Sequence, residues 1–254
     1  MTALLVAGAG VTGLVVGGLL DPVGQREAER SAEEQDARGG DSGGQPVIED
    51  AGRRPGRPPQ VLPAGPSTAR ILGAALVTGG LFAGAADRFG AHLALVPYCA
   101  FFAVLVLVST TDLSHGVIPR RLVYPAFGAL VCLFVAVATA DAEWHRLGSA
   151  AVGAAAAFAV VFVIWWLAPR GMGFGDVRLS ALIGLATGRL GLMATYVALT
   201  SAFVVGLLFG IATAGLPRTG RTVRIPFAPA LAAGAIVAVF WGVPIVQAVF
   251  HPTL

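Results

Sequence analysis

The chain has 254 residues, of which 56% are hydrophobic and only 12% are charged. Soluble domains carry roughly 25% charged residues, so this composition excludes an ordinary soluble protein and indicates one that resides in a membrane. The net charge is +3, but the basic residues form no patch interleaved with aromatic side chains, so we expect no binding of nucleic acid.

Eight apolar segments follow one another along the chain, and most approach the roughly 20 residues that a helix needs to cross a bilayer. They cover residues 2–20, 70–86, 93–111, 122–140, 147–168, 177–188, 190–215 and 227–250. The sixth segment is short for a span. The pattern predicts an all-α fold, a polytopic membrane helix bundle of about eight transmembrane helices.

Residues 21–69 differ in composition from the rest of the chain. Gly, Pro, Ser and Gln alternate there with charged side chains, and branched or aromatic apolar residues are few. Such a segment buries too little apolar surface to offset the entropy of ordering, so we expect a disordered cytoplasmic linker. The predicted organisation is a first transmembrane helix at 1–20, this linker, and a transmembrane domain at 70–254.

The arginines predict how the bundle is oriented, because cytoplasmic loops of membrane proteins are enriched in basic residues. If the N-terminus is external, only Arg88, Arg146 and Arg189 among the 17 basic residues fall outside the cell. Both termini are therefore expected to be external. The first segment lacks the basic start of a secretory signal, so we expect it to be retained as a helix.

The only two cysteines, Cys99 and Cys132, lie singly inside apolar segments. This spacing fits neither a metal site nor a disulfide framework, and it favours buried thiols that behave as small hydrophobic side chains. We predict no metal and no cofactor.

Two aspartates mark the candidate site. Asp112 ends the third apolar segment, and Asp176 precedes the sixth, after Gly171-Met172-Gly173-Phe174-Gly175. Charged side chains at membrane depth are costly, so they are functional-site candidates by default. In the predicted topology both emerge on the cytoplasmic side and can meet, whereas the other acids near the spans lie on the opposite side: Asp87, Asp141 and Glu143.

Two neighbouring carboxyl groups suit the hydrolysis of a peptide bond. They cannot both ionise easily, so they share a proton. The ionised group can then take a proton from water while the protonated group donates to the carbonyl or the leaving amine. Helix dipoles favour Asp176 as the ionised base, since Asp176 opens a helix and Asp112 closes one. The plainer alternative is that Asp176 only caps its helix and Asp112 is a solvated loop residue.

Three blocks of sequence resemble the prepilin peptidase family, membrane aspartic peptidases that trim type IV pilin precursors and related pseudopilins. The first block is Asp112 followed by Ile118-Pro119 and then Leu122 and Pro125. The second is the glycine-spaced Asp176 followed by Arg178-Leu179, and the third is Ile225-Pro226-Phe227-Ala228-Pro229. The resemblance covers about residues 93 to 250, and more loosely the glycine-rich first segment.

The resemblance implies that Asp112 and Asp176 are the catalytic dyad, and that five further residues bind substrate or support the site: Gly173, Gly175, Arg178, Ile118 and Pro119. It implies prepilin or pseudopilin substrates, held in membrane lipid and cut at the cytoplasmic face of a bacterial cell membrane. It leaves open which pilin is cut, in which pathway, and in which oligomeric state.

The chain departs from the family pattern in two places. Arg178 stands where the family usually has a lysine, which keeps the charge but changes its shape and donor geometry. Residues 21–69 contain no cysteine, whereas bifunctional members carry paired CxxC motifs between the first two spans. We therefore expect no N-methyltransferase activity, and the role of this linker stays open.

Two other membrane functions remain as alternatives. A presenilin-like intramembrane protease shares the Gly-x-Gly-Asp element, but pairs it with a Tyr-Asp sequence, and here Thr111 precedes Asp112. A proton-coupled transporter also uses intramembrane acids, usually near the bilayer midplane and within internal repeats that this chain lacks. A homologue that only binds pilins is a further possibility, which the presence of both aspartates disfavours.

Overall fold

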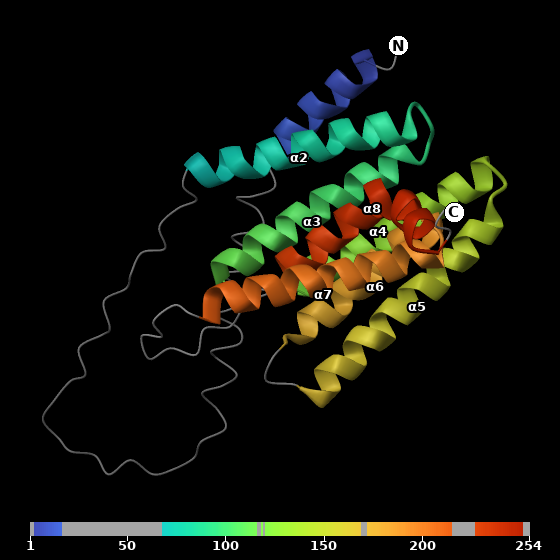
Figure 1. Cartoon of the computed structure of the whole chain (residues 1–254). Coiled ribbons are helices and arrows are strands. Elements are labelled where there is room, and N and C mark those ends of the chain that lie inside the picture. The colour runs from blue at the N-terminus through green and yellow to red at the C-terminus, as the bar shows by residue number, and fades with distance from the viewer. Residues whose placement is uncertain are drawn as a thin grey trace, which may run out of the picture.

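A computed structural model describes residues 3–16, 68–115, 118, 120–168, 172–214 and 227–250. Within these ranges the protein is built of helices and contains no strand, which confirms the predicted all-α class (Figure 1). A short N-terminal helix, Ala3–Val16, is followed by seven helices. These are α2 (Thr68–Phe89), α3 (Leu95–His115), α4 (Arg120–Ala140), α5 (Trp144–Leu167), α6 (Phe174–Leu190), α7 (Leu192–Ala214) and α8 (Ala228–Phe250). The predicted linker lies almost wholly outside the described residues.

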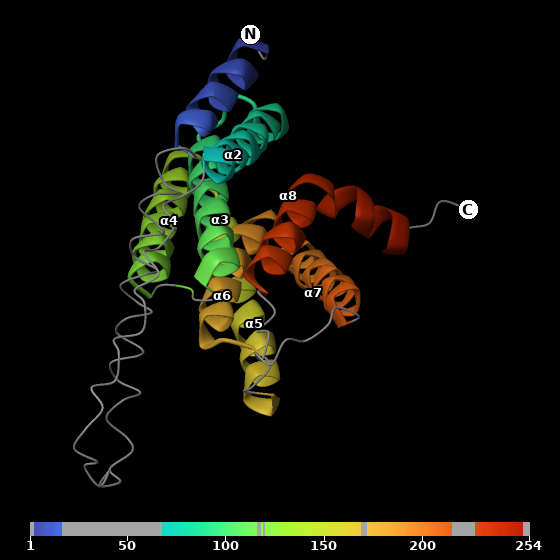
Figure 2. The ribbon, with the colours of Figure 1, turned by 90° about the vertical axis from the view of Figure 1, so that its left-hand side faces the viewer.

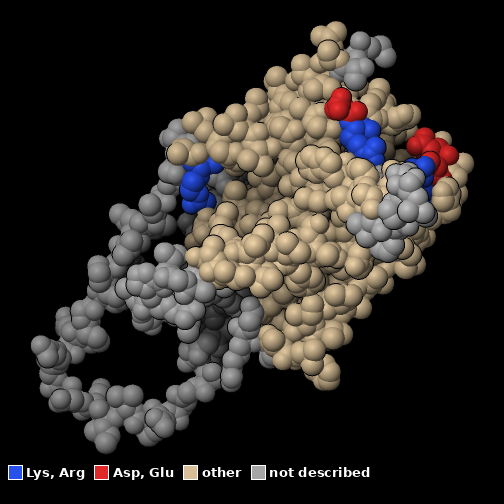
Figure 3. Space-filling model, viewed as in Figure 1, with Lys and Arg blue, Asp and Glu red and all other residues tan. Residues whose placement is uncertain are grey.

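Five of the described helices are long and apolar enough to cross a membrane: α2, α3, α4, α5 and α7. The predicted membrane bundle is thus confirmed, while the count of eight spans stays a prediction. The apolar stretches Ala3–Val16 and Ala228–Gly242 are shorter, and α6 has only 17 residues. On the face shown in Figure 3, the charged side chains lie at the two ends of the bundle, with a broad uncharged band between them.

Helix α6 is short because protein, not lipid, surrounds it. Every residue from Leu182 to Arg189 is buried, and α6 packs against α4, α5, α7 and α8. A helix that is buried on all sides belongs to the core of the bundle. A neighbour-covered helix also needs fewer apolar residues than one that faces the hydrocarbon of the bilayer.

The closest helix pairs are joined through glycine. A Cβ atom added at Gly153 of α5 would lie 2.5 Å from the carbonyl oxygen of Gly184 in α6. On α8, a Cβ at Gly234 would overlap the backbone of Ala198 and Ala202 in α7. Small residues let helix backbones approach closely, which is how helices associate in lipid without a hydrophobic driving force.

The N-terminal helix packs on α2 in the same way. A Cβ at Gly13 would lie 2.7 Å from the carbonyl oxygen of Thr78 and 2.8 Å from the Cα of Gly79. Gly13 therefore lies where the N-terminal helix contacts α2. Gly17, four residues farther along the same segment, lies outside the described residues.

Asp112 lies in the last turn of α3 and Asp176 in the first turn of α6, so each aspartate is at the helix end where the sequence placed it, and both helices extend a few residues beyond the predicted apolar segments. Helix α3 continues past residue 111 to His115, and three hydroxyl groups near its end bond back to carbonyls of the preceding turn: Thr110 to Leu107 at 3.0 Å, Thr111 to Val108 at 2.9 Å and Ser114 to Thr110 at 2.6 Å. These bonds satisfy polar side chains within the helix itself. Helix α6 likewise begins at Phe174, three residues before the predicted start.

The two thiols differ in their surroundings. Cys99 on α3 is half-buried, whereas Cys132 on α4 is exposed on the surface of the bundle. The prediction that both thiols are buried within the protein is therefore wrong for Cys132. Helix α4 is long and apolar enough to cross the membrane, and its outer face packs against no other described helix. A thiol on that face can be apolar in character because it faces lipid, not because protein buries it.

Candidate active site

Asp112 and Asp176 lie at the same end of the bundle. Tyr98, near the start of α3, donates a hydrogen bond to the carbonyl oxygen of Ala186, near the end of α6, at 2.9 Å. The two helices are antiparallel, so the part of α3 that follows Tyr98 and the part of α6 that precedes Ala186 lead to the same end of the bundle. A rise of 1.5 Å per residue places Asp112 roughly 21 Å from Tyr98 along α3, and Asp176 roughly 15 Å from Ala186 along α6.

Both aspartates therefore lie toward the same end of the bundle. Figures 1 and 2 show the end of α3 and the starts of α6 and α8 at the same end of the bundle. Contact between the two carboxyl groups stays a prediction.

Asp112 is buried, with 7% of its surface exposed. Its Oδ2 atom accepts a hydrogen bond from the backbone N–H of Ala228, the first residue of α8, at 3.0 Å. That N–H is one of the four at a helix start that have no acceptor within the helix. The alternative in which Asp112 is a solvated loop residue is therefore wrong.

Asp176 is buried to the same degree, with 6% of its surface exposed. It is the third residue of α6, and the residue that caps the helix is Gly173. The Oδ2 atom of Asp176 accepts a hydrogen bond from the Gly173 N–H at 3.1 Å, and the Asp176 N–H donates to the Gly173 carbonyl at 3.1 Å. Asp176 thus contributes to the capping of the helix from the third position, and the plainer alternative, in which Asp176 is itself the cap residue, does not hold because Gly173 occupies that position.

Both carboxylates accept a hydrogen bond at the start of a helix. Asp176 lies in the first turn of α6, and Asp112 meets the start of α8, although it belongs to the last turn of α3. The positive end of a helix dipole favours an anion in each case. The predicted asymmetry, in which only Asp176 gains from a helix start, does not hold. The prediction failed because α8 contacts Asp112, and the sequence around Asp112 gives no sign of this contact.

Of the two glycines proposed to support the site, Gly175 is the one that a close contact requires. A Cβ there would lie 2.7 Å from the Cβ of Ile118, so the structure brings these two predicted residues together. At Gly173, where the backbone is extended, the nearest atom to an added Cβ would be the Asp176 Oδ2 at 3.5 Å. Pro119 lies outside the described residues.

Arg178 lies between two aromatic rings on the far side of α6 from Asp176. Two residues along a helix turn the side chain by roughly 200°, so Arg178 and Asp176 face in different directions. The guanidinium carbon is 4.6 Å from the ring centre of Phe174 and 5.3 Å from that of Tyr124. Cation–π contacts of this kind tie the start of α6 to α4. Both of these contacts of Arg178 are with aromatic rings, and its supporting role in the site stays a prediction.

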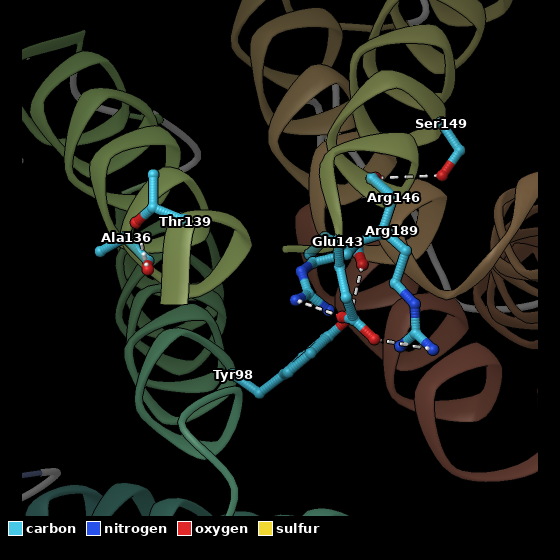
Figure 4. Close-up of polar contacts among 8 residues, drawn as sticks. Tyr98, Ala136, Thr139, Glu143, Arg146, Ser149 and Arg189 are labelled. Carbon is cyan, nitrogen blue, oxygen red and sulfur yellow. Dashed lines mark hydrogen bonds and ion pairs between the residues drawn. The ribbon is translucent and has the colours of Figure 1, made fainter. Parts of the chain in front are cut away.

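A second polar cluster occupies the opposite end of the bundle, and sequence reasoning assigned it no role. Glu143 lies between Arg189 and Arg146 and pairs with each at 3.2 Å, as Figure 4 shows. The Arg189 side chain is only 3% exposed and lies over the Phe134 ring at 5.6 Å. The cluster joins the ends of α4, α5 and α6, which are too far apart in sequence for a local pattern to reveal it.

Glu143→Ala should destabilise the fold more than Asp141→Ala. Removing Glu143 leaves the buried Arg189 cation without its carboxylate, and breaking a buried pair in this way costs about 3 kcal/mol. Asp141 is exposed on the same connection and carries the same charge, so it is the matched control. Thermal unfolding in detergent measures both variants. Equal unfolding temperatures for the two would show that the Glu143 cluster adds no stability.

The sequence matches the type IV leader peptidase family over residues 99–211, a stretch that contains both aspartates. It is 35% identical over 174 residues to the prepilin leader peptidase/N-methyltransferase of Bacillus subtilis, which covers 68% of this chain and 67% of that protein.

Proteins with the same name from Burkholderia pseudomallei and Aeromonas salmonicida are 30% and 31% identical. The chain spans about half the length of these two relatives, 54% and 47% respectively. No solved structure matches the chain significantly.

Proposed function

The chain belongs to the type IV leader peptidase family, and from this premise we propose that it is a membrane aspartic endopeptidase that removes the leader peptide from type IV prepilin or pseudopilin precursors. The observation that carries the proposal is the burial of Asp112 and Asp176 at one end of the bundle, each accepting a hydrogen bond from a helix start. The relatives' name also includes an N-methyltransferase. We extend only the peptidase part, because residues 21–69 contain no cysteine.

In the proposed reaction the two aspartates share one proton. The ionised aspartate takes a proton from water, whose oxygen attacks the scissile carbonyl carbon, while the protonated aspartate gives its proton to the carbonyl oxygen. As the C–N bond breaks, the resulting diol returns a proton to the aspartate that was protonated at the start. The aspartate that was ionised at the start then gives the proton it took from water to the departing amine. Both carboxyl groups are then back in their starting states.

The proposed substrate fits a site at the edge of the bilayer. A pilin precursor's apolar helix can lie in lipid beside the bundle, whose outer faces are apolar: Leu207, Leu208 and Ile211 of α7 are all more than half exposed. The leader then reaches the aspartates at the boundary, so partition into the membrane positions the scissile bond. Gly173, Gly175, Ile118, Pro119 and Arg178 are proposed to shape and support this entry.

We assign the aspartate end to the cytoplasmic face of a bacterial cell membrane, with both termini external. Support comes from the charges of the described residues. The aspartate end carries four arginines, Arg70, Arg120, Arg121 and Arg178. The other end carries as many acids as arginines, namely Asp87, Asp141 and Glu143 beside Arg88, Arg146 and Arg189. An excess of basic side chains favours the cytoplasmic side.

The depth of the aspartates favours a peptidase over a proton-coupled transporter. Transporter acids usually lie near the bilayer midplane on interrupted helices. Asp112 is in the last turn of α3 and Asp176 is in the first turn of α6, so both lie near a boundary. The family match over residues 99–211 favours a leader peptidase over a presenilin-like protease.

Cleavage in reconstituted membranes tests the proposal. The full chain is purified, placed in lipid vesicles and incubated with a pilin precursor, and the product is identified by intact mass. We expect a shortened pilin that has lost its basic leader and kept its apolar helix. An intact precursor, in a preparation where the Bacillus subtilis relative cuts the same substrate, would contradict the proposal.

A further inference from the structure

The start of α8 reaches the candidate site through its backbone. Ala228 is completely buried, and its N–H donates to the Oδ2 atom of Asp112. Phe227 precedes it and accepts the first hydrogen bond of the helix, from the Leu231 N–H to the Phe227 carbonyl at 3.1 Å. Phe227 is therefore the residue that caps α8, and its position fixes where the Ala228 N–H points.

The Phe227 ring is held by α7. It lies against the Phe203 ring, with ring centres 5.8 Å apart. Below it is Gly206, where an added Cβ would lie 2.6 Å from the Cε2 atom of Phe227. The ring thus occupies the space that any side chain at position 206 would fill. Farther along, α8 meets α7 again at Gly234, where an added Cβ would overlap the backbone of Ala198 and Ala202.

We propose that Phe227, seated on Gly206, is a positioning residue that orients the Asp112 carboxylate for peptide cleavage by presenting the Ala228 N–H to it. This inference rests on the proposed peptidase function. It gives a role to the Ile225-Pro226-Phe227-Ala228-Pro229 block. Ala228 of this block binds Asp112, although the two residues are 116 positions apart in the sequence. In this proposal Phe227 and Ala228 act on the geometry of the carboxylate and not on substrate binding.

The chain offers a three-variant test. Gly206→Ala inserts a methyl group under the ring and displaces Phe227. The double variant Gly206→Ala/Phe227→Leu shortens the ring side chain and restores the space. Gly242→Ala is the matched control, because a Cβ there would meet Ala194 of α7 only at 3.7 Å, an ordinary contact. All three variants are measured as full-length protein in vesicles, with kcat and KM for a pilin precursor and thermal unfolding as a check of the fold.

We expect Gly206→Ala to lower kcat by roughly 10- to 100-fold, because a small misplacement of a catalytic group has an effect of that size. KM should stay within about twofold, since substrate binding is unchanged in this account. The double variant should recover most of the lost kcat, and Gly242→Ala should match the wild type.

Three results would overturn the inference while leaving the peptidase proposal intact. The first is a Gly206→Ala variant with wild-type kcat, the second is a loss that lies in KM, and the third is a loss of kcat that Phe227→Leu does not relieve. A wild-type protein that fails to cut any pilin precursor would overturn both the inference and the function on which it rests.

Discussion

Asp112→Asn and Asp176→Asn, made separately, should each abolish cleavage of a pilin precursor. An asparagine can neither take a proton from water nor donate one as an acid, so we expect a loss of roughly 1,000-fold or more in kcat. Each asparagine keeps a carbonyl oxygen that can accept the bond now made by the Ala228 or Gly173 N–H, so the fold should survive. The measurement is the initial rate of leader removal in vesicles.

Two other aspartates provide the control for this experiment. Asp87 and Asp141 are exposed and lie at the opposite end of the bundle, so Asp87→Asn and Asp141→Asn remove the same charge without touching the site. Both should cleave at the wild-type rate. If either Asp112→Asn or Asp176→Asn cleaved as fast as these controls, the two-carboxylate mechanism would be wrong.

Gly184→Ala should be the most disruptive small substitution in the core. The new Cβ would overlap the Gly153 carbonyl and lie 2.7 Å from the Cβ of Ala157, so α5 and α6 must separate. Overpacking of this kind costs about 1–3 kcal/mol. Because α6 carries Asp176, cleavage should fall together with stability. Thermal unfolding and initial rate are measured on the same preparation.

Gly148→Ala is the matched variant for this prediction. Gly148 lies on α5, where an added Cβ meets no atom within 4 Å. Alanine is the better helix former, by roughly 1 kcal/mol in a helix interior, so this variant should be at least as stable as the wild type. An unfolding temperature for Gly184→Ala no lower than that of Gly148→Ala would show that the α5–α6 contact tolerates a side chain.

Hydropathy was sufficient to predict the helices, because a bilayer imposes length and apolar character on every span. It was weakest where protein replaces lipid. Helix α6 is short and wholly internal, and the ends of α3 and α6 that carry the aspartates are polar. There polar side chains lie within the helix and bond to its backbone, and an apolar pattern does not register such residues.

The aspartates themselves were predictable, whereas their partners were not. A charged residue at the end of an apolar segment is visible locally. The Ala228 N–H that binds Asp112 depends on how α8 packs, and the Glu143 cluster depends on three helix ends meeting. Both are contacts between residues far apart in the chain. The helix-dipole argument went wrong for the same reason, since it considered only the helix to which each aspartate belongs.

The proposed mechanism requires the carboxyl groups of Asp112 and Asp176 to come close enough to share a proton. Thiol cross-linking tests this directly in a chain whose native thiols are removed by Cys99→Ala and Cys132→Ala. The pair Asp112→Cys with Asp176→Cys is treated with a short bifunctional thiol reagent in vesicles, beside the distant pair Asp112→Cys with Asp87→Cys. Intact mass separates one bridging reagent from two singly attached ones.

We expect one bridging reagent for the pair at positions 112 and 176, and two separately attached reagents for the pair at positions 112 and 87. If the first pair also carried two separate reagents, with both thiols accessible to them, the two carboxyl groups would be too far apart to share a proton.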